Sequence, residues 1–212
     1  MPTSFRLVVV PGVVVDRWLR TWSQRVPATP LEVVPAEAAD APGLMPGRAD
    51  AGLVRLPVDR EALHAIPMYT ETTVVVIPRD HALAAADELT PAEVAEFDEP
   101  LLYPLDDVLP RPAPPPAAGY RPATTAEAVE LVAAGAGLLV VPQSLARLYH
   151  RRDLTYRPLT GAPASSVALA WPRDGHTELV EEMIGIVRGR TANSTRGRPD
   201  PQPATRRRRG RS

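Results

Sequence analysis

The stretch from Gly47 to Ala84, GRADAGLVRLPVDREALHAIPMYTETTVVVIPRDHALA, carries the strongest structural signal in the chain. Gly47 supplies a turn before a short apolar run at residues 51–54, and Pro57 and Asp59 end that run. A second run, at residues 72–77, is β-branched and unbroken by charged residues. It predicts a strand buried on both faces of a mostly parallel sheet. The sequence Pro-Arg-Asp-His at 78–81 then marks the start of a new unit.

A second informative block covers residues 124–171, TTAEAVELVAAGAGLLVVPQSLARLYHRRDLTYRPLTGAPASSVALAW. Thr124 or Thr125 caps a predicted helix at 125–134, and Ala-Gly-Ala-Gly at 134–137 ends it. An apolar strand is predicted at 138–141, followed by Pro-Gln-Ser at 142–144. A further strand is predicted at 167–171, where the sequence is Val-Ala-Leu-Ala-Trp.

Together the two blocks resemble the effector-binding (substrate-binding) domain of LysR-type transcriptional regulators. That family shows a Gly-x-x-Asp-x-Gly-Leu strand, found here at 47–53, and a Val-Val-x-Pro-x-x-His-x-Leu-Ala crossover, found at 75–84. The resemblance covers about residues 4–190, and it implies an α/β, two-lobed periplasmic-binding-protein-like (type 2) fold with a ligand cleft between the lobes. Lobe I is expected at 1–77 plus 166–189 and lobe II at 78–165, with crossings near 77–79 and 160–165.

Composition narrows the possible functions. The chain of 212 residues contains no Cys, which excludes disulfides, thiolate catalysis and Cys-ligated zinc. Its start lacks the pattern of a secretory signal, and no apolar run has the length of a membrane span, so we expect a cytoplasmic protein without a membrane partner. Residues 190–212 are rich in Arg and Pro, which predicts a disordered basic tail. The tail's arginines are either solvated or in contact with phosphate backbones.

Between the two blocks and at the start, further elements follow from hydrophobic spacing and turn residues. Strands are predicted at 5–10 and 31–34, and a helix at 14–26 with Trp18 and Trp22 on it. Thr90-Pro91 opens a short helix. The proline-rich run at 109–116 predicts an extended loop. A final helix at 177–188 is expected to rest on lobe I.

Ligands of α/β lobes gather at the carboxyl ends of strands, where free backbone N–H groups of helix N-termini favour anions. Four places in this chain are expected to face such a cleft, and the resemblance implies the same loops. The candidate ligand-binding residues are Pro11, Gly12, Val13, Arg55, Tyr103, Pro104, Thr124 and Thr125.

Each candidate has more than one interpretation. Relatives often carry a hydroxyl residue in the first loop, whereas Val13 has none, which favours an aromatic or branched carboxylic acid as the effector. Thr124 and Thr125 either cap the helix or contact the ligand. Arg55 either pairs with an anionic ligand or is a solvated residue at the edge of a strand.

Nothing in the sequence predicts catalysis. His81 is interpreted as a hydrogen-bonded structural residue, and the other histidines have no metal-ligand spacing. Asp106 and Asp107 are expected to be exposed beside the proline-rich loop. There is no nucleophile elbow and no phosphate-binding loop. We therefore expect a protein that is not an enzyme and has no cofactor or metal.

The predicted function is an effector-sensing domain that binds a small metabolite in transcriptional regulation. LysR-type regulators begin with a winged helix-turn-helix, whereas Met1 lies almost directly before the first predicted strand, so no sequence-specific DNA binding by this chain alone is expected. A solute-binding protein of a transporter and a stand-alone modulator that pairs with full-length regulators are the alternatives. The resemblance also implies a homodimer or a heterodimer with related regulators, with one of the tryptophans in the core and the other at the interface.

Overall fold

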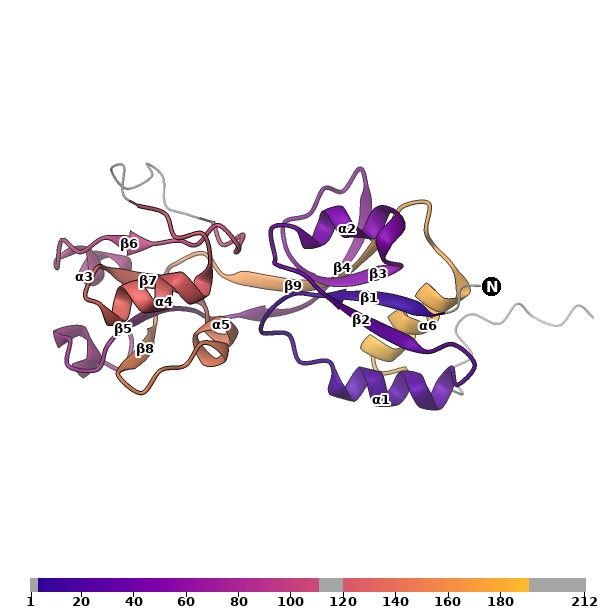
Figure 1. The fold of residues 1–212 in the computed structure, drawn as a ribbon, viewed down its shortest axis with the longest axis horizontal. Coiled ribbons are helices and arrows are strands. Elements are labelled where there is room, and N and C mark those ends of the chain that lie inside the picture. The colour runs from indigo at the N-terminus through magenta and orange to yellow at the C-terminus, as the bar shows by residue number, and fades with distance from the viewer. Residues whose placement is uncertain (1–3, 111–119, 191–212) are drawn as a thin grey trace, which may run out of the picture.

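Two α/β lobes lie side by side and are joined by two crossing segments (Figure 1). The computed structural model describes residues 4–110 and 120–190, so the predicted basic tail and most of the proline-rich loop lie outside the described residues. The predicted two-lobed fold is confirmed. No helix in the described ranges is both long enough and apolar enough to cross a bilayer.

Lobe I is built on a five-stranded sheet with the order β2-β1-β3-β9-β4. Strand β1 is parallel to β2 and β3, and β9 runs antiparallel to β3 and β4. Its elements are β1 (Phe5–Val9), α1 (Asp16–Arg25), β2 (Leu31–Pro35), α2 (Ala41–Arg48), β3 (Ala51–Arg55), β4 (Leu63–Glu71), β9 (Ser165–Pro172) and α6 (Glu178–Val187).

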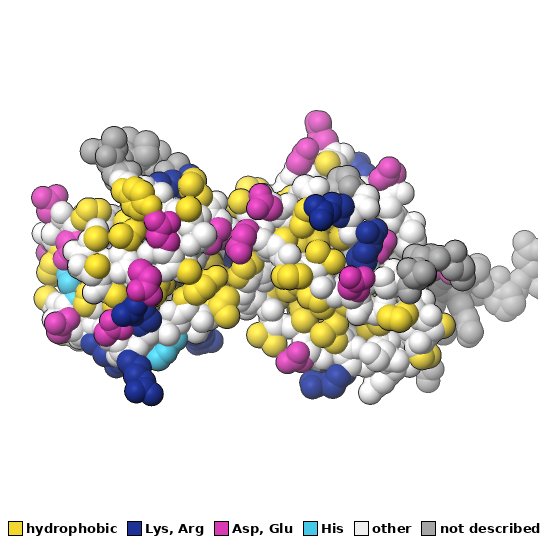
Figure 2. Space-filling model, viewed as in Figure 1, with side chains coloured by type: hydrophobic (Ala, Val, Ile, Leu, Met, Phe, Trp, Pro, Cys, Tyr) yellow, Lys and Arg dark blue, Asp and Glu magenta, His cyan; other side chains and the backbone are white. Residues whose placement is uncertain are grey.

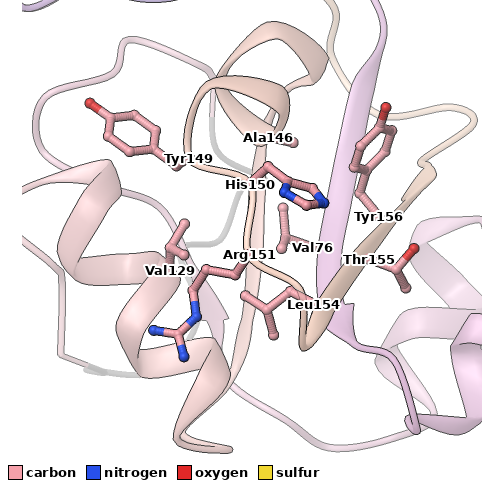
Figure 3. A pocket seen from close by; sticks show the side chains of 9 residues that line it. All are labelled: Val76, Val129, Ala146, Tyr149, His150, Arg151, Leu154, Thr155 and Tyr156. Carbon is pink, nitrogen blue, oxygen red and sulfur yellow. The ribbon is translucent and has the colours of Figure 1, made fainter.

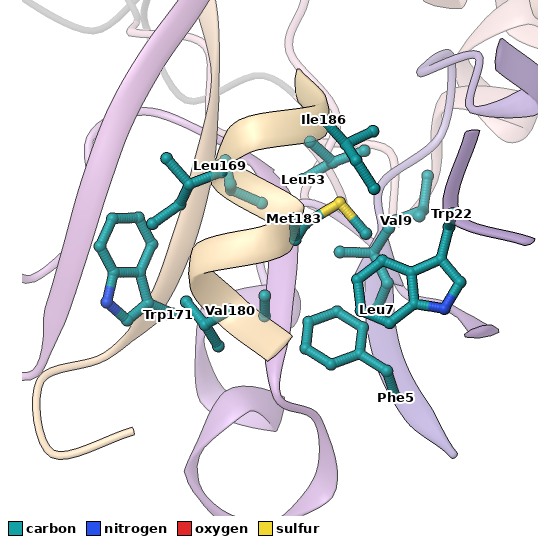
Figure 4. Packing of buried hydrophobic residues seen from close by; sticks show 12 residues of the cluster. Phe5, Leu7, Val9, Trp22, Leu53, Leu169, Trp171, Val180, Met183 and Ile186 are labelled. Carbon is teal, nitrogen blue, oxygen red and sulfur yellow. The ribbon is translucent and has the colours of Figure 1, made fainter. Parts of the chain in front are cut away.

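Helices cover both faces of this sheet. Figure 4 shows Val180 and Met183 of α6 packed against strand residues such as Leu7 and Leu53. The other face is covered by α2, whose Met45 is fully buried. The prediction that the last helix rests on lobe I is therefore confirmed.

Lobe II is built on a four-stranded sheet with the order β6-β7-β5-β8. Its elements are β5 (Thr73–Pro78), the 3-10 turn η1 (Ala82–Ala85), α3 (Pro91–Ala95), β6 (Leu101–Leu102), α4 (Thr125–Ala133), β7 (Leu138–Pro142), α5 (Gln143–Leu148) and β8 (Leu154–Pro158). A capping box at Thr90 and Glu93 opens α3, as its sequence predicts.

The apolar run at 72–77 differs from expectation in its lobe and in the direction of its neighbouring strands. It forms β5 at the centre of the lobe II sheet, so its placement at the end of lobe I is wrong. Both neighbours, β7 and β8, run antiparallel to it, so the expectation of parallel pairing is also wrong. Val74 and Val76 pack into one core cluster while Val75 and Ile77 pack into another. Burial on two faces therefore explains the unbroken run without parallel neighbours.

Strand β4 is the element that sequence reasoning missed. Polar residues interrupt its apolar positions, and its pairing with β9 contains a bulge between Pro67 and Tyr69. Because β4 lies at the edge of the sheet, it tolerates Pro67. With β4 completing lobe I, the first crossing falls at Thr72 instead of at 77–79.

Candidate functional site

Arg55 lies at the centre of the junction between the lobes. It is the last residue of β3, and its side chain is fully buried. Both terminal nitrogens donate two hydrogen bonds each: Nη1 to Glu71 Oε2 (2.5 Å) and Ser165 Oγ (3.0 Å), and Nη2 to Pro11 O (3.3 Å) and Ser144 Oγ (3.1 Å). The four N–H groups of these two nitrogens are thus all occupied by protein acceptors.

The partners of Arg55 come from both lobes and both crossings. Glu71 ends β4 at the first crossing, and Ser165 begins β9 at the second. Ser144 belongs to α5 of lobe II, and its hydroxyl also donates to Glu71 Oε2 at 3.0 Å. A single guanidinium therefore links both crossings and both lobes.

Asp107 completes this buried cluster from the loop after β6. Its Oδ1 lies 3.6 Å from Arg55 Nε, and its side chain is 3% exposed. Burial raises the pKa of Asp107, although the charge of Arg55 acts in the opposite direction. The expectation that the Asp106-Asp107 pair is exposed is wrong for Asp107, because its side chain is buried against Arg55, a cation that lies 52 positions earlier in the chain.

Asp106 organises the start of α4. Its carboxylate accepts hydrogen bonds from Thr125 N at 2.7 Å and from Thr125 Oγ1 at 2.9 Å. Thr125 is buried, whereas Thr124 is exposed and accepts a hydrogen bond from Glu127 N as the helix cap. The capping interpretation of Thr124 is confirmed, and the Thr125 hydroxyl is engaged by a neighbouring loop.

A narrow cavity lies beside this cluster, between the lobes. Pro11 and Arg55 line it from lobe I, and Asp106, Thr125 and others line it from lobe II. Its volume of about 10 Å³ is at the lower limit for one water molecule. Glu37 lies at the edge of this cavity, and its pKa is raised mainly by partial desolvation. The negative charges of Asp106 and Asp40 raise this pKa further. Figure 2 shows acidic side chains gathered at the waist between the lobes.

A larger open hollow lies at the same junction. Its volume is about 400 Å³, within the range of about 300–1,000 Å³ that ligand pockets occupy. The lining residues come from the loop after β1 and from α5: Gly12, Val13, Val14, Ser144, Arg147 and Leu148. Val14 is 77% exposed and Leu148 is 55% exposed.

The two lobes approach each other very closely at Gly12. This residue has φ of +84°, and a Cβ placed on it would lie 2.4 Å from Ser144 Oγ. Only glycine allows both the positive φ and this approach. The predicted Pro11-Gly12-Val13 loop therefore does reach lobe II, through backbone atoms.

Tyr103 and Pro104 lie away from both spaces. Both are buried, and Tyr103 belongs to a core cluster of lobe II. Their carbonyl oxygens accept hydrogen bonds from Arg121. The structure thus brings Pro11, Arg55 and Thr125 together and places Tyr103 in the core.

A third cavity lies within lobe II, next to α4, α5 and β8 (Figure 3). Its volume is about 20 Å³, which is room for little more than one water molecule. Elsewhere in lobe II, His81 accepts a hydrogen bond from Leu83 N at Nδ1, and its Nε2 lies 2.8 Å from Glu99 Oε1. His81 is thus a structural residue, as predicted. Within residues 4–110 and 120–190, no three His, Cys, Asp or Glu side chains form a group that could hold a metal ion.

Of the two interpretations of Arg55, the solvated edge residue is wrong, and pairing with an anionic ligand stays a prediction. Arg55 is not a solvated edge residue, because its side chain is fully buried. Its terminal nitrogens are also already occupied by protein groups. Sequence reasoning missed Glu71, Ser144 and Asp107, and no local pattern marks them as partners of Arg55.

The profile described as "LysR substrate binding domain" matches residues 4–192. The chain is 28% identical over 155 residues to the HTH-type transcriptional regulator AlsR of Bacillus subtilis, covering 68% of this chain and 50% of AlsR. It is 25% identical over 162 residues to the Hca operon transcriptional activator HcaR of Escherichia coli, covering 70% and 53%. The chain spans about half the length of these curated relatives.

Solved structures show the same fold. The BenM effector binding domain with its effector benzoate has a TM-score of 0.67 and 20% identity, over 89% of this chain and 92% of that one. The oxidized form of OxyR has a TM-score of 0.69 and 18% identity, over 89% and 94%.

Proposed function

Because this chain belongs to the LysR substrate-binding domain family, we propose that it senses a small-molecule effector at the junction of its two lobes and thereby takes part in transcriptional regulation. The observation that carries the proposal is the pair of features at that junction: a buried guanidinium that links both crossings, and an open hollow beside it. The curated relatives are transcriptional regulators, which favours a regulatory role over the transporter and enzyme alternatives.

The structure suggests how binding is converted into a signal. The hollow is lined by the Gly12–Val14 loop of lobe I and by α5 of lobe II, so a molecule bound there contacts both lobes at once. A ligand shifts a conformational equilibrium only by its difference in affinity for the two states. A site shared by two lobes has this difference, because opening the junction removes the contacts on one side.

The effector that we propose is a carboxylic acid with an aromatic or branched body. Val13, Val14 and Leu148 give the hollow an apolar wall, as the hydroxyl-free first loop predicts. In the solved relative, the effector of BenM is benzoate. Among the candidate contacts, we retain Gly12 and Val13 for the ligand and assign Arg55 and Thr125 to the supporting framework.

We also propose a cytoplasmic protein that pairs with a second LysR-type chain through α1. Trp22 is 1% exposed, and its Nε1 donates to Thr29 O at 2.8 Å, so it belongs to the core. Trp18 is only partly buried and lines a surface hollow with Met68 and Val187. Changing Trp18 to Glu should lower the molar mass found by light scattering to that of the monomer, and an unchanged mass would refute this interface.

A thermal-shift screen tests effector binding. The panel contains aromatic and branched acids, their amides, and sugars. A ligand at a hundred times its dissociation constant stabilises the folded state by about 2.7 kcal/mol, so the unfolding temperature should rise measurably. No shift with any compound would contradict the sensing function. A Gly12→Ala variant, which should hold the lobes apart, is expected to lose the shift that the wild-type chain shows.

A further inference from the structure

We infer that Arg147, and not Arg55, binds the carboxylate of the effector in the hollow between the Gly12–Val14 loop and α5. This inference rests on the proposed sensing function and assigns the residue that binds the negatively charged group of the effector. Arg147 lies in α5 of lobe II and lines the hollow.

The two guanidinium groups differ in how many of their hydrogen-bond donors are already used. Each arginine has five N–H donors. In Arg55, the four donors of Nη1 and Nη2 are used by Glu71, Ser165, Pro11 and Ser144. Its Nε faces Asp107 Oδ1 at 3.6 Å. An effector carboxylate would have to displace at least one of these protein acceptors in order to reach a terminal nitrogen of Arg55.

Arg147 is in the opposite situation. Among the described residues, its one hydrogen bond is from Nε to Tyr156 Oη, at 3.2 Å, and it makes no ion pair. Both terminal nitrogens therefore keep their donors for another partner. These donors form the planar fork that binds a carboxylate through two parallel hydrogen bonds.

The rest of the hollow fits the same ligand class. Ser144 is the only other polar side chain in its lining, and its hydroxyl already accepts from Arg55 and donates to Glu71. The walls are Val13, Val14 and Leu148, which suit an apolar body. The narrow cavity carries Glu37 and Asp106, which repel an anion, and the cation in its lining, Arg55, is already paired with Glu71 and Asp107. Charge complementarity thus favours the hollow, with Arg147 as its cation.

The experiment uses two pairs of probes that have nearly the same shape and differ in charge: benzoate with benzamide, and isovalerate with isovaleramide. Dissociation constants are measured by calorimetry with the full chain. Arg147→Gln should weaken binding of the acids by about tenfold or more, because a hydrogen bond to a charged group contributes roughly 1.5–3 kcal/mol. The dissociation constants of the amides should change by less than about twofold, which is much less than the loss of one charged hydrogen bond would cause.

Two control variants distinguish recognition of the carboxylate by Arg147 from general effects of a substitution on the fold. Tyr156→Phe removes the hydrogen bond of Arg147 Nε and keeps the guanidinium, so it should leave acid binding nearly unchanged. Arg152→Gln removes an exposed cation of the same lobe that does not line the hollow, and it should also have no effect.

The outcomes decide between the inference and the proposed function. Unchanged acid binding in Arg147→Gln overturns the inference, and so does an equal loss for acids and amides. If neither acid binds the wild-type chain while another compound of the screening panel does, the inference fails and the sensing function stands. If no compound of the panel binds, both fail.

Discussion

Replacing Arg55 with Met should destabilise the folded chain by about 3–5 kcal/mol, the usual cost of removing one partner from a buried ion pair. Met keeps most of the apolar volume of the Arg side chain, so the change mainly removes the charge and four hydrogen bonds. Two carboxylates then lose their counter-charge: Glu71, with a side chain 10% exposed, and Asp107, with one 3% exposed. Both crossings also lose their link to lobe I.

The cost depends on pH in a direction that the structure fixes. Without Arg55, the pKa of Asp107 must rise further, because burial already raises it and the opposing charge is gone. Protonation then removes the unpaired charge, so the destabilisation should be smaller in mildly acid solution than at neutral pH.

Urea unfolding, followed by tryptophan fluorescence and far-ultraviolet circular dichroism, measures this change in free energy. The control is the triple variant Arg55→Met, Glu71→Gln and Asp107→Asn, in which no charge is left unpaired. It should recover most of the lost stability, since replacing all partners of a buried pair is often neutral. A loss below about 1 kcal/mol in the single variant, typical of an exposed pair, would refute the buried link. So would a triple variant that is no more stable than the single one.

Three further substitutions test separate parts of the fold by the same unfolding measurement. Gly12→Ala should lower the free energy of unfolding by more than the roughly 1–2 kcal/mol of a left-handed residue, because the new Cβ would also meet Ser144. Gly161 is the control, since it has φ of +83° and no neighbour within 4 Å of an added Cβ. Equal losses of stability in Gly12→Ala and Gly161→Ala would contradict the close approach at Gly12. Leu139→Ala in the lobe II sheet should cost about 2–5 kcal/mol, and a smaller loss would contradict its complete burial. Because the pKa of Asp107 is raised on folding, its contribution to stability is complete below the unfolded pKa near 3.8 and is lost as pH rises through the folded pKa. Asp107→Asn should therefore flatten the dependence of the unfolding free energy on pH in that window. An unchanged pH dependence would contradict the raised pKa.

The sequence alone predicts most of the local structure. β-branched runs mark the central strands, Thr90 and Thr124 mark helix starts, and Gly12 marks a turn where the chain reverses. These signals work because capping, chain reversal and burial of neighbouring positions involve residues that are close in the sequence. The motifs at 47–53 and 75–84 also identify the two-lobed fold.

Strand partners and lobe boundaries are harder to predict. A run buried on both faces, such as β5, has the same apolar pattern whether its neighbours are parallel or antiparallel, so its pattern cannot assign it to a sheet. Strand β4 escapes prediction because an edge strand tolerates Pro67 and polar residues. The boundary between the lobes depends on assigning β4 and β5 to their sheets, so it could not be placed from the sequence either.

The contacts at the junction between the lobes are decided only by the tertiary structure. Arg55 bonds to residues 16, 44, 89 and 110 positions away, and no local pattern records such partners. The sequence shows that Arg55 and Arg147 both carry a positive charge, and it cannot show which of them is already paired. Folding brings Glu71, Ser144 and Asp107 onto Arg55 and leaves Arg147 beside an apolar hollow, because long-range packing determines which charges are neutralised and which can still bind a ligand.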